Sequence, residues 1–208
     1  MRAFEFGNPE ADLVLVQMVG DHDLSYIAGE IALIRQQSPK DFRFLALQVD
    51  NWNADLSPWE APAVFGNEGF GSGAAQTLEY LQDICSDTSK TYILGGYSLS
   101  ALFALWAASR TSLFSGVAAA SPSMWFPGFL DHMRANPLHC GMAYLSLGDK
   151  EEKTRNPVMA TVAKCIRTAH TILTEQGITS TLEWNPGNHF RDADQRTAKA
   201  FAWVMNQI

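Results

Sequence analysis

Short apolar runs alternate with amphipathic segments along most of the chain. The runs Leu13–Val19, Phe42–Val49 and Met142–Gly148 carry almost no charge, which is typical of strands that are buried on both faces. Helix-length segments such as Ala74–Cys85 and Pro157–Gln176 separate the runs and repeat their apolar residues at helical spacing. Strands that alternate with helices form parallel sheets, because each parallel connection needs a crossover. We therefore predict a mostly parallel sheet with helices on both faces.

The same alternation continues through the remaining segments. A chain of 208 residues is long enough for one domain with a full core, so we expect a single domain over residues 1–208 with no large lid domain. One long connection, Asp50–Gly73, is expected to be functional, since loops of that length are uncommon in compact domains. The other predicted strands are Thr91–Ser98, Gly116–Ser121 and Ser180–Trp184, and the other predicted helices are Asp23–Pro39, Leu99–Ser109 and Asp192–Ile208.

Charge and cysteine content exclude several classes of partner. The net charge is −7 and no cluster of Lys or Arg stands out, so we expect neither a nucleic acid nor a membrane as partner. The three cysteines follow no zinc or disulfide pattern, and we predict no metal site and no cofactor. Unpaired thiols and the lack of a basic segment before the first apolar run favour a cytoplasmic protein without a targeting signal. The sequence does not determine the oligomeric state.

The segment ILGGYSLSALFALW (Ile93–Trp106) joins an apolar strand to an apolar helix through a glycine–serine turn. A nucleophilic serine on such a turn needs small neighbours two positions away on each side, so that strand and helix can approach. Gly96 and Ser100 hold those positions around Ser98, with serine where glycine is usual. The turn also sets Ser98 at the positive end of the following helix. We predict that Ser98 is a nucleophile.

An acidic loop and a histidine follow two later strands. The chain order of serine, acid and histidine is that of the α/β-hydrolase triad, and it differs from the orders in chymotrypsin and subtilisin. His189 comes directly after the last strand, and a neutral imidazole can accept the proton of a serine. The acid that orients it is expected to be Glu151, and the alternatives are Asp149 or Glu152 of the same loop, or no acid.

Backbone amides and aromatic residues at the same sheet edge complete the predicted site. The amide of Leu99 and one from the loop Gly20–His22, with Asp21 preferred, are expected to form the oxyanion hole. Trp52, Trp125 and Phe126 stand in connections after strands and are predicted to line the substrate pocket.

The stretches GGYSLSALFALWAA, FSGVAAASPSMWF, YLSLGDKEEKTRNP and NPGNHF resemble the esterase family of α/β-hydrolases that includes esterase D-like enzymes, feruloyl esterases and enterochelin (siderophore) esterases. The similarity extends from about Thr91 to the last residue, and before that it is limited to strand order. Met124 departs from the family pattern, since it separates Ser123 from the aromatic pair. The resemblance implies an α/β-hydrolase fold, a nucleophile at Ser98, a base at His189 and an acid at Glu151.

These observations favour a serine hydrolase that cleaves a small-molecule carboxylic ester through an acyl-Ser98 intermediate. Two alternatives stay open at this point. The same triad could serve a thioesterase or an acyltransferase. Alternatively, the protein could be a binding module that keeps the fold but has no catalytic activity. The acyl group and the alcohol of the substrate do not follow from the sequence.

Overall fold

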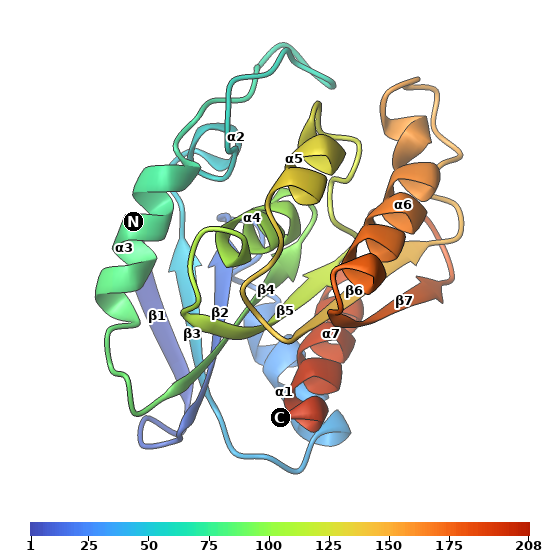
Figure 1. Ribbon diagram of the computed structural model, residues 1–208. Helices are drawn as coiled ribbons and strands as arrows, with labels where there is room; N and C mark the ends of the chain where they lie inside the picture. Colours follow the sequence, from blue (N-terminus) through green and yellow to red (C-terminus); the bar gives the residue numbers. More distant parts are fainter.

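The computed structural model describes residues 1–208 and contains one seven-stranded sheet (Figure 1). The strand order across the sheet is β1-β3-β2-β4-β5-β6-β7. β1 runs antiparallel to β3, and every other neighbouring pair is parallel. The strands are β1 (Arg2–Gly7), β2 (Leu13–Val19), β3 (Arg43–Gln48), β4 (Thr91–Tyr97), β5 (Phe114–Ala120), β6 (Met142–Gly148) and β7 (Thr179–Asn185).

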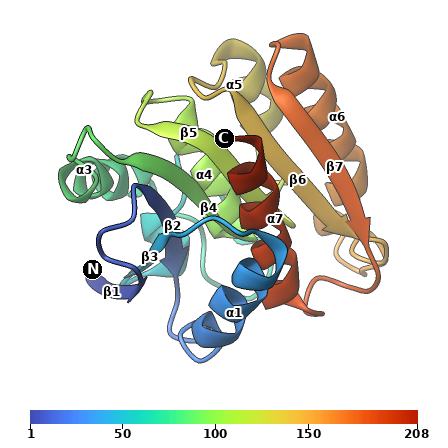
Figure 2. The same ribbon diagram turned by 90° about the horizontal axis from the view of Figure 1, so that it is seen from below.

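Helices cover both faces of the sheet, as predicted. Seen from below, α1 and α7 lie on one face, and α3, α4, α5 and α6 lie on the other (Figure 2). Successive side chains of β2 enter opposite layers: Val14 and Val16 pack under α4, whereas Leu13 and Leu15 pack with α1 and α7. The helices are α1 (Ile27–Gln37), α2 (Trp52–Asp55), α3 (Ala74–Ile84), α4 (Leu99–Ala108), α5 (Phe129–Ala135), α6 (Val162–Glu175) and α7 (Ala193–Gln207), with a short 3₁₀ turn over Met159–Thr161.

The parallel strands and the long helices agree with the sequence-based expectations. β2 and β6 have the predicted bounds, and the others differ by one or two residues at their ends. No separate domain is inserted between the strands, and the long connection Asp50–Gly73 contains α2 and an isolated bridge between Ala61 and Phe70. None of the helices combines the length and the apolar character that spanning a bilayer requires.

The edge strand β1 was not predicted from the sequence. Its residues are mostly exposed, and only Phe4 and Phe6 turn toward the neighbouring layer, where Phe6 meets Phe44 edge-on at 6.5 Å between ring centroids. The spacing of Phe4 and Phe6 is a period-two signal, but it extends over too few residues to separate a half-exposed strand from a loop.

Small residues let α7 approach the middle of the sheet. A Cβ atom on Gly95 of β4 would lie 2.6 Å from the ring of Phe201 and 2.8 Å from Ala118. A Cβ atom on Gly116 of β5 would lie 2.5 Å from Val204. These distances are shorter than carbon atoms tolerate, so glycine is required where α7 crosses β4 and β5. This close packing fixes the start of α7 near the carboxyl ends of the strands.

One carboxyl group is buried between β2 and α1. Glu30 is 3% exposed, and its only side-chain partner is Gln17, whose amide donates to it over 3.4 Å. Burial, opposed in part by that hydrogen bond, raises the pKa of Glu30 from its ordinary value of 4.5 to about 8. Between about pH 4.5 and pH 8, Glu30 is therefore protonated in the folded protein and ionised in the unfolded chain. The free energy of unfolding falls as the pH rises through this range.

Glu30→Gln should make stability less dependent on pH. The wild type loses stability as the pH rises from about 4.5 to about 8, whereas the uncharged amide pays no such cost. The gain in free energy of unfolding from the substitution should be about 2–4 kcal/mol larger near pH 9 than near pH 5. Urea unfolding at the two pH values measures this, with Glu152→Gln, at an exposed position, as control. An equal effect at both pH values would contradict the assignment.

Candidate active site

Ser98 lies in a strained turn between β4 and α4. Its backbone has φ 59° and ψ −120°, a conformation that costs energy for a residue with a side chain. A Cβ atom on Gly96 would collide with the hydroxyl of Ser100, so the turn requires glycine at that position. The hydroxyl of Ser100 is buried and donates to the carbonyl of Met18 at 2.8 Å, which gives serine a structural role where the motif usually has glycine. The local sequence thus holds the Ser98 hydroxyl at the carboxyl edge of the sheet.

Three predicted side chains form a continuous hydrogen-bonded chain. The hydroxyl oxygen of Ser98 lies 3.0 Å from Nε2 of His189, and Nδ1 of His189 lies 2.7 Å from Oε2 of Glu151. The Glu151 side chain is 3% exposed and that of His189 is 23% exposed. This arrangement allows the imidazole to accept the serine proton while the buried carboxylate stabilises the charge that results.

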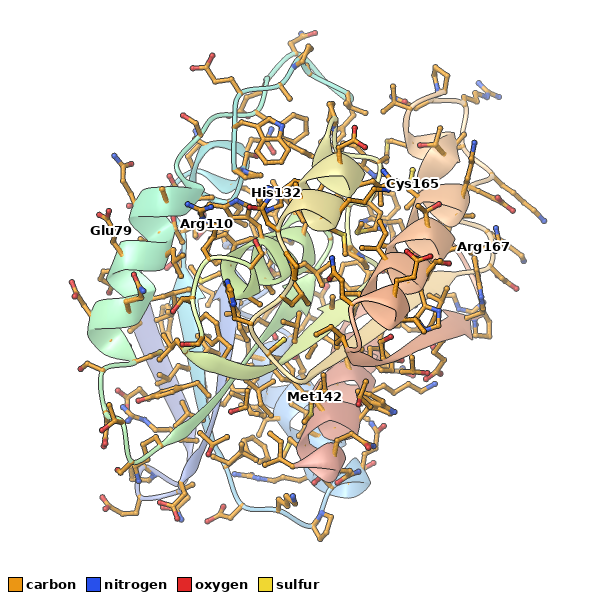
Figure 3. All side chains as sticks on the ribbon, in the orientation of Figure 1. Glu79, Arg110, His132, Met142, Cys165 and Arg167 are labelled. Atoms are coloured by element: carbon orange, nitrogen blue, oxygen red, sulfur yellow. The ribbon has the colours of Figure 1, made fainter.

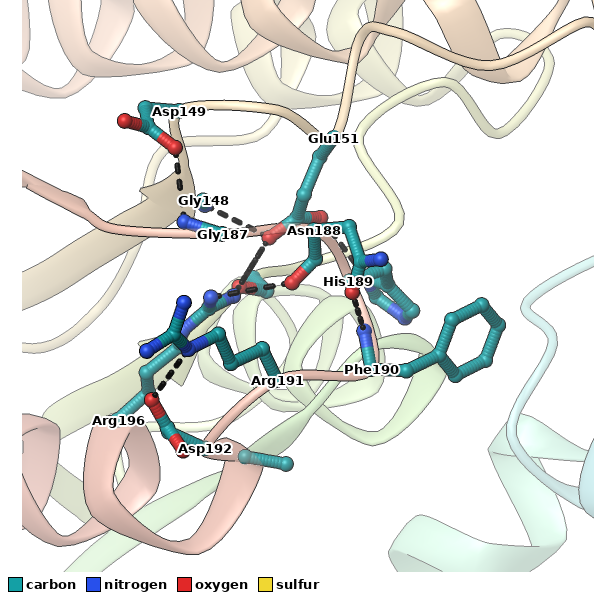
Figure 4. Close-up of polar contacts among 12 residues, drawn as sticks. Gly148, Asp149, Glu151, Gly187, Asn188, His189, Phe190, Arg191, Asp192 and Arg196 are labelled. Carbon is teal, nitrogen blue, oxygen red and sulfur yellow. Dashed lines mark hydrogen bonds and ion pairs between the residues drawn. The ribbon is translucent and has the colours of Figure 1, made fainter.

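Of the three carboxylates in the acidic loop, only Glu151 contacts the histidine. Asp149 instead accepts a hydrogen bond from the amide of Gly187 at 2.8 Å, at the beginning of the loop that carries His189 (Figure 4). Glu152 is exposed and forms no hydrogen bond or ion pair. The geometry therefore separates the alternatives that the sequence left open, and it gives Asp149 a part in shaping the histidine loop.

The surroundings of Glu151 keep its carboxyl group ionised. Burial acts to raise its pKa, but the hydrogen bond and charge of His189, the amide of Gly148 and the hydroxyl of Ser121 hold the pKa of Glu151 below its usual range. The Gly148 amide donates over 2.7 Å and the Ser121 hydroxyl over 2.8 Å, both to Oε1. A negative charge is therefore available on the side of His189 that faces away from Ser98.

Unbonded backbone amides lie at both predicted oxyanion positions. Leu99 is the first residue of α4, and its N–H donates to no other group in the protein. In the turn after β2, the Gly20 amide is occupied by the carboxylate of Asp23 at 2.8 Å, whereas the amides of Asp21 and His22 have no acceptor. The carboxylate of Asp21 accepts a hydrogen bond from the side chain of Gln48, so the group that Asp21 offers to an oxyanion is its backbone amide.

The predicted aromatic wall divides into a half-exposed and a buried part. Trp52, at the start of α2, meets the ring of His22 at 5.6 Å beside Gly20, and Trp125 is half-buried against Phe65. Phe126 is different, because it is 2% exposed within the core. Its predicted place in the pocket wall is not supported, since a ring enclosed by Phe70 and Trp59 does not face a substrate.

Sequence reasoning missed several polar residues around the three side chains. Arg196 is buried on α7, and the hydroxyl of Tyr97 donates to the backbone carbonyl of His189 at 2.6 Å. The hydroxyl of Ser123 lies 3.2 Å from that of Ser98. One signal was available for Arg196, since it precedes Ala200 and Val204 by one and two helical turns and so shares their buried face.

A second serine–histidine contact exists at the far end of α4, and it differs in the other partners of both side chains. The hydroxyl of Ser109 lies 3.0 Å from Nε2 of His132 but donates to the carbonyl of Trp106 within its own helix end. Nδ1 of His132 faces the side-chain amide of Asn136 and no carboxylate. His132 lies on α5 near Arg110 (Figure 3), and burial together with that charge lowers its pKa. This pair closes the end of a helix.

No group of three or more His, Cys, Asp and Glu side chains is arranged to hold a metal ion. The three cysteines, Cys85, Cys140 and Cys165, are all free thiols. A hollow of about 520 Å³ lies at the opposite edge of the sheet, among Asn8, Asp12 and Thr91, and contains no nucleophile paired with a base. At the strained serine turn, by contrast, a hydroxyl, an imidazole and a carboxylate are joined by hydrogen bonds.

Comparisons with known proteins identify the class of fold. No protein-family model matches the sequence, and no curated protein does. Among solved structures, the siderophore hydrolase EstA from Aspergillus nidulans matches with a TM-score of 0.71 at 15% identity, over 99% of this chain and 94% of that chain. The carboxylesterase from Bacillus cereus matches with a TM-score of 0.64 at 13% identity, over 100% and 95%. The chain has the α/β-hydrolase fold.

A third match is longer than this chain. The enterobactin esterase FES from Shigella flexneri gives a TM-score of 0.66 at 13% identity over 99% of this chain. The match covers 55% of FES, so this chain spans about half the length of that protein. Identities this low establish the fold that these proteins share, and leave the activity of this chain to be argued from its own residues.

Proposed function

We propose that this protein is a serine hydrolase that cleaves a carboxylic ester through an acyl-Ser98 intermediate. The observation that carries the proposal is the hydrogen-bonded chain from Ser98 through His189 to Glu151, with distances of 3.0 and 2.7 Å. The strained turn supports it independently, because strain of this kind persists at functional sites where the surroundings enforce it.

The proposed reaction has two steps that use the same groups. The Ser98 oxygen attacks the ester carbonyl carbon, and its proton passes to Nε2 of His189. The tetrahedral intermediate then collapses, the bond to the alcohol breaks, and the alcohol leaves with the proton from His189. In the second step water attacks the acyl carbon and loses a proton to Nε2 of His189. The bond between that carbon and the Ser98 oxygen then breaks, Ser98 takes the proton back from His189, and the carboxylic acid is released. Glu151 holds the imidazole in one tautomer throughout.

The negative charge that develops on the carbonyl oxygen needs donors that are already in place. We assign this role to the unbonded amides of Leu99 and Asp21, since the first sits at the positive end of α4 and the second in the neighbouring loop. A single donor of this kind contributes roughly 10²–10³ to turnover in other hydrolases.

Proteins of the same fold support the proposed substrate class, and the free thiols support the proposed compartment. The structures that share the fold include proteins named as a siderophore hydrolase, an enterobactin esterase and a carboxylesterase, so all three are hydrolases by name and two of them are esterases. We propose that the activity resides in one domain over residues 1–208 and acts on a small-molecule ester. Three free thiols fit a reducing compartment, and we propose the cytoplasm.

Ser98→Ala should abolish ester hydrolysis and labelling by a fluorophosphonate probe, because no other hydroxyl is paired with an activated base. Labelling followed by mass spectrometry of the modified peptide measures this. The matched control is Ser109→Ala, which removes the other serine that contacts a histidine and should leave labelling unchanged. Labelling of the Ser98→Ala protein at the wild-type rate would refute the proposed mechanism.

The choice of acid is tested by replacing each candidate with its amide. Glu151→Gln should lower kcat by a factor of roughly 10³–10⁴, since an amide cannot stabilise the imidazolium and favours the wrong tautomer. Asp149→Asn keeps an oxygen that can accept from Gly187 and should retain most of the activity. Steady-state kinetics on a p-nitrophenyl ester distinguish the two. The opposite ranking would assign the role to Asp149.

Half-exposed aromatic rings near the site favour an ester with an aryl or other apolar group. Trp52 lies beside the oxyanion turn, and Phe190, directly after His189, is 87% exposed. Trp125 and the half-exposed Phe65 meet at 6.4 Å between ring centroids in neighbouring connections. Partly exposed aromatic rings in connections at this edge of the sheet offer apolar surface that a ligand can remove from water. We propose that they contact the alcohol or the acyl group.

Trp52→Ala should raise KM for aryl esters by about tenfold or more, and should raise it less for acetyl esters of small alcohols, because only the larger substrates bury the indole ring. A panel of esters of varied size measures the difference. Trp203→Ala, which removes a half-buried tryptophan that packs on Tyr144 instead, is the control. Equal losses for all esters would show that Trp52 serves packing alone.

A further inference from the structure

Arg196 is a buried guanidinium behind the proposed triad. Its side chain is 2% exposed, and Nη1 donates to Oε1 of Glu151 at 2.9 Å (Figure 4). That oxygen is the one that does not contact His189, so the carboxylate lies between the guanidinium and the imidazole. Arg196 belongs to α7, Glu151 follows β6, and His189 follows β7.

The same guanidinium also contacts the histidine loop, which is the connection between β7 and α7 over residues 186–192. Nη2 donates to the carbonyls of Pro186 and Asn188 at 3.1 and 3.0 Å. Nη1 further donates to the Tyr97 hydroxyl at 3.0 Å, and Tyr97 in turn donates to the carbonyl of His189. Direct or relayed contacts from one side chain therefore fix three of the four carbonyls from Pro186 to His189, and the fourth, at Gly187, accepts from the backbone amide of Lys150.

The charge of Arg196 acts on the Glu151–His189 pair as a unit. Glu151 and His189 share their protons through one hydrogen bond, so the pair takes up an additional proton at a pH that belongs to both. A buried positive charge 2.9 Å from the carboxylate disfavours that uptake. Without Arg196, the buried carboxylate would have no permanent positive charge beside it. The pair would then bind the additional proton more readily, either on the carboxylate oxygen or on the imidazole. Either species would prevent His189 from accepting the proton of Ser98.

We propose that Arg196 is a positioning residue for the reaction assigned above, on which this inference rests. It aligns the histidine loop with the acid, and it keeps the Glu151–His189 pair in its reactive protonation state near neutral pH.

The other polar groups around the pair do not supply this charge. Tyr97 of β4 is neutral, since burial and the neighbouring Glu151 raise its pKa to about 12. Ser121, after β5, contributes an uncharged hydroxyl, and Asp149, after β6, is a further negative group directed at Gly187. Arg191, in the histidine loop, is largely exposed and pairs with Asp192. Arg196 is thus the buried cation that faces the carboxylate.

The test compares the rate of labelling by a fluorophosphonate probe across pH 5–9 in three variants of the full chain. Arg196→Met removes the charge and all of the contacts. Arg196→Lys keeps a positive charge but cannot reproduce the paired contacts of Nη2. Arg191→Met removes an exposed arginine three residues beyond Asn188 and is the matched control, whose rate and pH profile should equal those of the wild type.

In Arg196→Met, the pH below which labelling slows should rise by about one unit or more. In Arg196→Lys, that pH should stay within a few tenths of the wild-type value, while the plateau rate should fall by about tenfold or more because the loop carbonyls lose their donors. A slower Arg196→Met with an unshifted pH profile would overturn the proposal, since a purely structural role changes the rate without changing the profile. If Arg196→Met fails to fold, a wild-type rate in Arg196→Lys would overturn it.

Wild-type and Ser98→Ala proteins, assayed alongside, separate this inference from the proposed function. Labelling that requires Ser98 upholds the nucleophile, whatever the Arg196 variants show. Wild-type protein that does not react at Ser98 would remove the proposed function itself, and with it the basis for the role of Arg196.

Discussion

The buried ion pair between Glu151 and Arg196 joins segments that lie far apart in the chain. The carboxylate follows β6 and the guanidinium stands on α7, yet both side chains are almost inaccessible to water. Removing two charges from water costs several kcal/mol per ion, and the cost is recovered only when hydrogen bonds satisfy both groups. Here the carboxylate accepts from His189, Gly148 and Ser121, and the guanidinium donates to carbonyls of the histidine loop. Only Nε of the guanidinium has no acceptor, and the hydrogen bonds of Nη2 require the histidine loop in its folded position.

The folded position of the histidine loop depends in turn on its contacts with the acidic loop and with Arg196. The histidine loop turns through Gly187, at φ 106°, where a side chain would also collide with Arg191. A Cβ atom on Gly148 would collide with the carbonyl of Gly187, so the acidic loop and the histidine loop can approach only through two glycines. The Asp149 carboxylate accepts from the amide of Gly187, and donors at Lys150 and Arg196 bind carbonyls of the loop, so that its backbone is fixed. Loops are ordinarily more mobile than helices and strands, whereas every carbonyl of this one from Pro186 to His189 accepts a hydrogen bond.

The sequence predicted those parts of the structure that short-range patterns control. Continuous apolar runs identified the parallel strands, and the strand-end positions of Ser98 and His189 identified two members of the site, because parallel strands bring their carboxyl ends to one edge. The choice among Asp149, Glu151 and Glu152 could not follow from spacing, since one turn of loop decides which carboxylate faces the imidazole. Arg196 was missed because a charged residue in an amphipathic helix is usually exposed, and only its long-range partners explain its burial. Phe126 was misjudged for the converse reason, since an aromatic residue after a strand can equally pack inward.

The position of Arg196 depends in turn on the small residues of the central sheet. α7 reaches the middle of the sheet because Gly95 and Gly116 leave room for Phe201 and Val204. If either glycine carried a side chain, its Cβ atom would lie 2.5–2.6 Å from Phe201 or Val204, and an outward shift of α7 that relieved this contact would also move the guanidinium on the same helix. A displacement of that size exceeds the tolerance of hydrogen bonds near 3 Å, as well as that of a reactive contact between Ser98 and His189. The glycines of β4 and β5 therefore act on the site without touching it, through the distance at which a helix can pack on a sheet.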